Sequence, residues 1–177
     1  STAGSIIPNY ALIDEYGVNI VGEYYLQITH NLIALKGQSI EDIKEVQSHP
    51  MALLQCRDFF KDNTDIVLIE EKDTAHVAKK IAENKIKGLG AIASDLASKI
   101  YKLDIINDNI QTIKKNQTRF VILQKKRQTK NLDFNKASVK FELDHKRGSL
   151  AAILNVLSDC KLNLTKIQSM PKIQTPW

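Results

Sequence analysis

Three short polar segments hold the residues whose types could do chemistry, and each lies beside an apolar stretch. They are STAGS at 1–5, SHPMALLQC at 48–56 and NQTRF at 116–120. In α/β sheets, ligands collect at strand ends beside helix N-termini, where unpaired backbone N–H groups favour anions. The three segments therefore indicate a site for an anionic small molecule.

The second segment has the pattern of a helix start. Ser48 is a candidate N-cap, and Pro50 suits the first turn. Ser48 and His49 would bring a hydroxyl, an imidazole and free backbone amides together. Gln55 lies two helical turns further along the same side. Taken alone, the same pattern is also typical of an ordinary helix cap.

The third segment pairs a hydroxyl with a guanidinium. Thr118 is a hydrogen-bond donor, and Arg119 offers a planar fork that suits a carboxylate. We expect both side chains to face the same crevice as the turn formed by His49 and Pro50. Taken alone, this segment is also typical of a turn.

Motifs for metals and cofactors are missing from the sequence. The four histidines are dispersed, and there is no HExxH, CxxC, P-loop, dinucleotide fingerprint or GxSxG motif. GLGAIAS contains one GxG without a third glycine, which indicates tight strand packing. Cys56 and Cys160 are far apart in sequence and are expected to be reduced thiols. We therefore expect no metal and no cofactor.

Composition limits the class of protein. Of 177 residues, 43% are hydrophobic and 25% are charged, which indicates a globular chain rather than a disordered one. No apolar run approaches the ~20 residues of a membrane span. The net charge of +5 comes from 25 basic and 20 interspersed acidic residues, which is too weak a bias to indicate nucleic-acid binding. We expect a cytoplasmic protein with neither a membrane nor a nucleic-acid partner.

Alternating strands and helices must position these segments. The pattern predicts an α/β fold with a largely parallel sheet. The apolar run 65–70 is expected to be a buried strand, and a helix is expected to begin near Ser94. The other expected strands are 20–28, 90–93, 103–106 and 118–123, and the other expected helices are 48–60 and 73–84. The apolar face of the helix 48–60 is expected to consist of Leu53, Leu54, Cys56, Phe59 and Phe60.

A second, smaller unit follows a basic linker at 125–137. Alternation predicts a strand at 138–143, helical spacing predicts a helix at 150–161, and a further strand is expected at 163–169. Three elements over about 40 residues cannot close a core by themselves. We therefore expect more chain, or a partner, to complete this unit.

Successive blocks of the sequence resemble one family in order. They are STAGSIIPNYALID, GEYYLQITHNL, EVQSHPMALLQCRDFF, GAIASDLASKIYKLDIINDNIQ and NQTRFVIL, and they are similar to the prephenate dehydratase catalytic domain. The tail KFELDHKRGSLAAILNVLSDCKLNLTKIQSMP resembles the start of an ACT domain. The resemblance implies part of a two-lobe catalytic domain of the periplasmic-binding-protein type at 1–124 and part of a ferredoxin-like ACT domain at 138–177, as in a fragment truncated at both ends.

The resemblance also implies an activity and its residues. The family removes water and carbon dioxide from prephenate and yields phenylpyruvate in phenylalanine biosynthesis. By the matching motifs, the catalytic residues are Thr118, Ser48 and Gln55. The implied substrate-binding residues are Arg119, Phe120, His49, Ser1, Thr2, Ala3 and Gly4. Two alternatives stay open: an arogenate dehydratase, and a non-catalytic module that senses an amino acid.

The ACT resemblance implies control by L-phenylalanine and assembly into dimers or tetramers. The family's Glu-Ser-Arg-Pro motif falls on 168–171, where Gln168 and Met170 replace the charged residues, so the charge pattern of the motif is absent here. The implied effector-binding residues are Gly148, Ser149, Leu150, Ala151, Asn163, Gln168 and Ser169.

Overall fold

A computed structural model describes residues 6–125 and 134–170. The chain divides into two compact units, Ser1–Gln128 and Thr129–Trp177. The division falls inside the linker expected at 125–137.

The centre of the first unit is a five-stranded sheet in the order β4-β3-β5-β2-β6. Within this described sheet, β3 pairs in parallel with β4 and β5, and β2 is antiparallel to β5 and β6. Four strands therefore run in one direction, as a largely parallel α/β sheet requires, and β2 is inserted against them. The strands are β2 (Asn31–Ala34), β3 (Glu45–Ser48), β4 (Val67–Glu70), β5 (Leu89–Ala93) and β6 (Asp104–Asn107).

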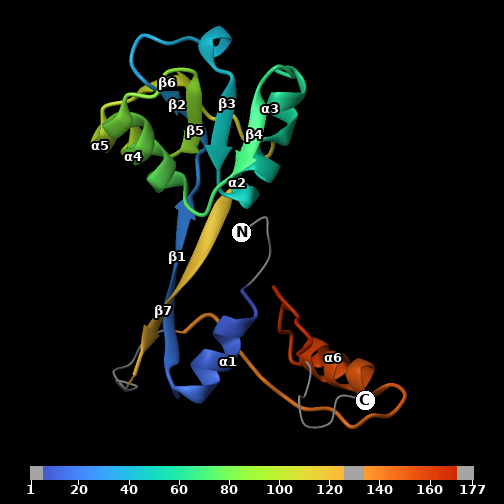
Figure 1. Ribbon diagram of the computed structural model, residues 1–177. Coiled ribbons are helices and arrows are strands. Elements are labelled where there is room, and N and C mark those ends of the chain that lie inside the picture. Colours follow the sequence, from blue (N-terminus) through green and yellow to red (C-terminus); the bar gives the residue numbers. More distant parts are fainter. Residues whose placement is uncertain (1–5, 126–133, 171–177) are drawn as a thin grey trace. The chain divides into compact units, whose positions relative to one another are not determined.

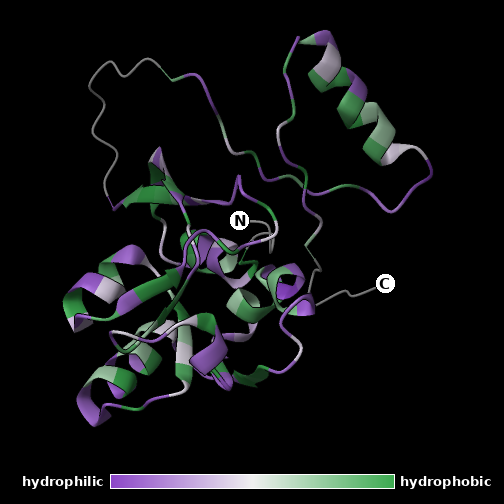
Figure 2. Cartoon of the chain, turned by 90° about the horizontal axis from the view of Figure 1, so that it is seen from above, coloured by the Kyte–Doolittle hydropathy of each residue, from purple (hydrophilic) through white to green (hydrophobic). Residues whose placement is uncertain are grey.

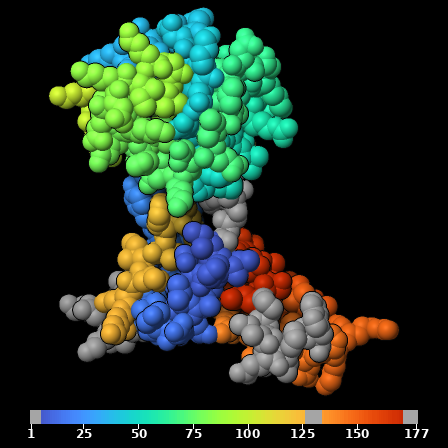
Figure 3. All heavy atoms as spheres, in the orientation of Figure 1, coloured from blue at the N-terminus to red at the C-terminus, as the bar shows by residue number. Residues whose placement is uncertain are grey.

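Helices cover both faces of this sheet (Figure 1). On one face, α2 (Pro50–Gln55) and α3 (Arg57–Lys61) pack Leu53 and Phe60 against strand residues such as Leu32. On the other face, α4 (Thr74–Asn84) and α5 (Asp95–Tyr101) pack around Ile33. In the space-filling view, the atoms of the five-stranded sheet and its helices form one continuous body (Figure 3).

Two expectations about burial are wrong. All four residues of β4 are exposed, because β4 lies at the edge of the sheet and has only β3 beside it. Leu54, expected on the apolar face of one long helix, is 59% exposed. The helix is broken at Cys56 into α2 and α3, so the helical spacing does not continue through the segment.

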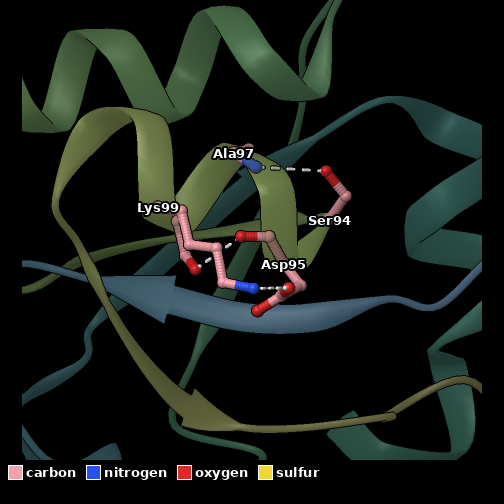
Figure 4. A network of polar contacts seen from close by, with 5 residues as sticks. Ser94, Asp95, Ala97 and Lys99 are labelled. Carbon is pink, nitrogen blue, oxygen red and sulfur yellow. Dashed lines mark hydrogen bonds and ion pairs between the residues drawn. The ribbon is translucent and has the colours of Figure 1, made fainter.

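The start of α5 follows its sequence signal (Figure 4). Ser94 Oγ accepts a hydrogen bond from the Ala97 backbone N–H at 3.2 Å, as an N-cap does. Lys99 Nζ lies 2.6 Å from an Asp95 carboxylate oxygen, one turn apart. Because Ser94 directly follows β5, the cap turns the chain from strand into helix within one residue.

A separate two-stranded ribbon extends from the sheet (Figure 1). Strands β1 (Asn19–Gln27) and β7 (Gln117–Gln124) pair antiparallel along their whole length, with Leu26 opposite Thr118. Both strands were expected from β-branched and aromatic residues. The short helix α1 (Pro8–Glu15) precedes β1 and was not expected.

Within the described residues 134–170 of the second unit there is one helix, α6 (Ser149–Asp159), close to the expected bounds. Gly148 precedes it with φ of +83°, a left-handed conformation that favours glycine. Within the described residues 134–170, neither 138–143 nor 163–169 is a strand, so these two expectations are wrong. A strand needs a neighbouring strand to pair with, and among the described residues neither segment is paired with one.

Candidate active site

The chain passes between sheet and ribbon at two crossovers, residues 28–30 and 108–116. Two backbone hydrogen bonds of 2.8 Å hold the crossovers side by side, from Ile28 N–H to Asn116 O and from Ile110 N–H to His30 O. The two segments therefore form one junction between the two sheets.

Gln55, at the end of α2, is joined to both crossovers. Its Oε1 lies 2.7 Å from His30 Nε2 and accepts a hydrogen bond from Asn116 Nδ2 at 3.1 Å. Its backbone oxygen accepts from Thr112 N–H at 2.9 Å. The SHPMALLQC and NQTRF segments, which are far apart in the sequence, thus meet at this junction.

Buried amides continue the network beneath the junction. Gln111 Oε1 accepts from the His30 backbone N–H at 3.0 Å, and Gln111 Nε2 donates to Asn109 Oδ1 at 2.6 Å. Asn31 Oδ1 accepts from the Asn109 backbone N–H at 2.9 Å. Gln111 is 1% exposed and Asn31 is 3% exposed, so these hydrogen bonds satisfy groups that water does not reach.

Sequence reasoning did not single out His30, Asn31 or Gln111, and it included Asn116 in the NQTRF segment without giving it a role. The signal for the first three is present, because THN and DNIQ are polar interruptions where apolar strands end or begin. Recognising it requires knowing that the two interruptions lie together.

Thr118 lies on β7, two residues beyond Asn116, and is half-buried. Successive strand residues point to opposite faces, so Thr118 shares its face with Phe120, while Arg119 points to the other. Arg119 Nη2 lies 2.8 Å from Glu23 Oε1, and this hydrogen bond raises the pKa of the Arg119 guanidinium. The expectation that the hydroxyl and the guanidinium face one crevice is therefore wrong.

The expected arrangement at the start of α2 is also wrong. Ser48 is fully buried as the last residue of β3, and its Oγ donates to Ile92 O at 3.0 Å. His49 is the N-cap instead, with Nδ1 accepting from Met51 N–H at 3.1 Å. Pro50 has no N–H, and Ala52 N–H donates to His49 O. The hydroxyl and these first amides are thus used within the fold and do not form an open anion site.

The remaining expected site residues fall into two groups. Ser1, Thr2, Ala3 and Gly4 lie outside the described residues. In the second unit, Ser149 and Leu150 line an open hollow of ≈ 390 Å³, and Gly148 lies between its lining residues Arg147 and Ser149 in the sequence. Ala151 follows them on α6, and Asn163, Gln168 and Ser169 lie in exposed coil.

Two further observations concern the described ranges 6–125 and 134–170. No group of three or more His, Cys, Asp or Glu side chains is placed to hold a metal ion there. No helix in that part of the chain has the length and apolarity needed to cross a membrane.

Known proteins of one family and its relatives are similar to this chain over most of its length. The model of the family described as prephenate dehydratase matches residues 1–128. Arogenate dehydratase 2 of Petunia hybrida is 42% identical over 97% of this chain and 43% of its own length. The prephenate dehydratase of Methanocaldococcus jannaschii is 39% identical over 97% of this chain and 62% of its own length.

A solved structure agrees with these sequence relatives. The prephenate dehydratase of Staphylococcus aureus superposes with a TM-score of 0.79 at 26% identity, covering 97% of this chain and 63% of that one. This chain therefore spans between 43% and 63% of the length of these three relatives. The family match covers the junction, the ribbon and the five-stranded sheet, and the chain belongs to the prephenate dehydratase family.

Proposed function

We propose that the protein catalyses the decarboxylating dehydration of prephenate to phenylpyruvate, with its centre at the junction between sheet and ribbon. The observation that carries this proposal is the hydrogen bond between Gln55 Oε1 and Asn116 Nδ2. It ties the glutamine of one family motif to the segment that carries Thr118 in the other. Family membership supplies the reaction class.

The protein itself needs to do little covalent chemistry in this reaction. The bond between the ring and the carboxylate breaks, and its electron pair enters the ring as carbon dioxide leaves. The ring hydroxyl takes up one proton, which comes in net terms from solvent, and leaves as water, so that the ring becomes aromatic. An enzyme for this reaction needs to hold a dianion and to hydrogen-bond the departing hydroxyl.

The side chains divide these tasks by their positions. Thr118 donates to the departing hydroxyl, and Phe120, on the same strand face, packs against the ring. Gln55 contacts the substrate through its amide. Ser48 acts by holding the end of β3 against β5, and His49 by capping α2. A substrate contact by Arg119 requires its guanidinium to exchange Glu23 for a substrate carboxylate.

Removing the Thr118 hydroxyl tests the assignment. In the full-length protein, Thr118→Val should lower kcat for phenylpyruvate formation by about 10²–10³, with little change in KM, because one transition-state donor is lost. Thr118→Ser is the matched control and should retain most of the activity. Turnover of the valine variant at the wild-type rate removes Thr118 from the mechanism.

Arogenate is a second candidate substrate, favoured by the 42% identity to the petunia protein named arogenate dehydratase. It carries an amino group where prephenate carries a keto group, so the site must accept a cation beside the carboxylates. Measuring kcat/KM for both substrates with one preparation decides between them. No turnover of either substrate contradicts the proposed activity.

We also propose that residues 138–177 begin an ACT domain that binds L-phenylalanine at the turn of Gly148, after a linker at 125–137. The hollow beside Ser149 and Leu150 supports this proposal. A ligand that binds only the folded protein raises the unfolding midpoint. An upward shift of the midpoint of the full-length protein with millimolar L-phenylalanine is expected. Its absence contradicts the sensor, and sedimentation tests the dimer or tetramer proposed with it.

A further inference from the structure

His30 has no role in the proposed chemistry so far, yet it contacts Gln55 directly. Gln55 Oε1 lies between two donors, His30 Nε2 at 2.7 Å and Asn116 Nδ2 at 3.1 Å. A carboxamide whose oxygen accepts from two sides has its plane and its oxygen end fixed. Its NH₂ group then points away from both donors.

The backbone of His30 is itself fixed from both sides. Its N–H donates to Gln111 Oε1 at 3.0 Å, and its carbonyl accepts from Ile110 N–H at 2.8 Å. Because Gln111 is 1% exposed, this support lies in the interior of the unit. The imidazole therefore extends from a rigid segment, as a group that orients another side chain must.

We propose that His30 is a positioning residue for Gln55. Its Nε2–H holds the Gln55 oxygen and so fixes the direction in which the Gln55 NH₂ group donates. The imidazole makes no contact with the substrate in this arrangement. This inference rests on the proposed function, since it assigns the orientation of one of that site's residues.

Removing the imidazole donor is the first test. His30→Leu should lower kcat/KM for prephenate in the full-length protein by about 10–10²-fold, the scale of a small misplacement in a site. His30→Gln is the matched control, because its amide Nε2 places a donor near the position of the imidazole Nε2. It should restore most of the activity, whereas a purely space-filling role of His30 predicts no such rescue.

A double-mutant cycle separates action through Gln55 from action elsewhere. If His30 works through Gln55, adding His30→Leu to Gln55→Ala should cost less than threefold further. If the loss in kcat/KM of the double variant equals the product of the two single losses, the residues act independently and the inference is overturned. Thermal midpoints of all four proteins establish that each one folds.

A variant that keeps the network covers the case in which His30→Leu does not fold. Gln55→Glu retains oxygens that accept from His30 and Asn116 but has no NH₂ group. It should fold and lose turnover as Gln55→Ala does; retained turnover overturns the inference. If the wild-type protein turns over neither prephenate nor arogenate, the proposed function fails instead. If the wild-type protein turns over either substrate and the His30→Leu variant does so at the same rate, the positioning role alone fails.

Discussion

The helices α4 and α6 are both 11 residues long, and both carry apolar residues at helical spacing. The helices in Figure 2 carry both hydrophobic and hydrophilic residues along their length. The helices α4 and α6 differ in what covers them. Val77, Ala78 and Ile81 of α4 are fully buried in the cluster around Ile33, whereas none of the residues of α6 is buried against the described part of the chain. An amphipathic sequence thus sufficed for a helix in both units, and burial depended on the sheet that only α4 has beside it.

The starts of the two helices also differ, because only α4 of the two has a side-chain cap. Asp73 Oδ1 accepts from the backbone N–H groups of Ala75 at 2.6 Å and His76 at 3.2 Å, which caps α4. Gly148 has no side chain with which to cap α6. The helix α6 therefore has neither of the two supports that α4 has, a side-chain cap and burial against a sheet. Isolated helices of this length are only marginally stable in water.

The thiols of the two units give the largest expected contrast. Burial raises the pKa of Cys56 to about 12, against an ordinary value of 9.0, whereas Cys160, at the end of α6, is exposed. Three pKa units lower the thiolate fraction about 10³-fold, and the thiolate is the reactive form. At pH 8, iodoacetamide should therefore modify Cys160 and leave Cys56 intact, as peptide mass spectrometry can measure. Equal labelling of the folded chain contradicts the burial of α2 and α3 on the sheet.

A matched pair of valines gives the next contrast. Val77→Ala in α4 should reduce the free energy of unfolding of the first unit by about 2 kcal/mol, since two buried methyl groups are lost and a cavity is left. Val156 of α6 is 57% exposed. Val156→Ala should be neutral or stabilising by up to about 0.5 kcal/mol, because alanine is the better helix former. Urea denaturation measures both changes, and equal losses would show that α6 is packed as tightly as α4.

The cap of α4 gives the smallest contrast. Asp73→Ala should cost about 1 kcal/mol, whereas Asp73→Asn should cost much less, because it keeps the accepting oxygen. Ser149→Ala, at the first position of α6, should change stability by less than about 0.5 kcal/mol. Hydrogen exchange of the first-turn amides reports each helix separately. A Ser149→Ala loss as large as that of Asp73→Ala contradicts the difference between the two starts.

Elements with a local signal were predictable. The periodicity of 73–84, the cap at Ser94 and the β-branched runs of β1 and β7 lie within the elements they specify. Strands β2 and β3 were missed, because each is only four residues long and its pairing partners are distant in the sequence. The strands expected at 138–143 and 163–169 have suitable residues, but no neighbouring strand pairs with them in the described chain.

For the candidate site, the sequence alone determined which residue types are available: the Thr118 hydroxyl, the Gln55 amide and the motifs that identify the family. Tertiary structure decided how they are used. It directed the Ser48 hydroxyl to Ile92, set Arg119 on the strand face opposite Thr118, and brought His30 and Asn116 to one oxygen of Gln55. These contacts span 25 to 96 residues of sequence, and local propensity does not specify them. They form only when strands pair in a particular register and the crossovers close on one another.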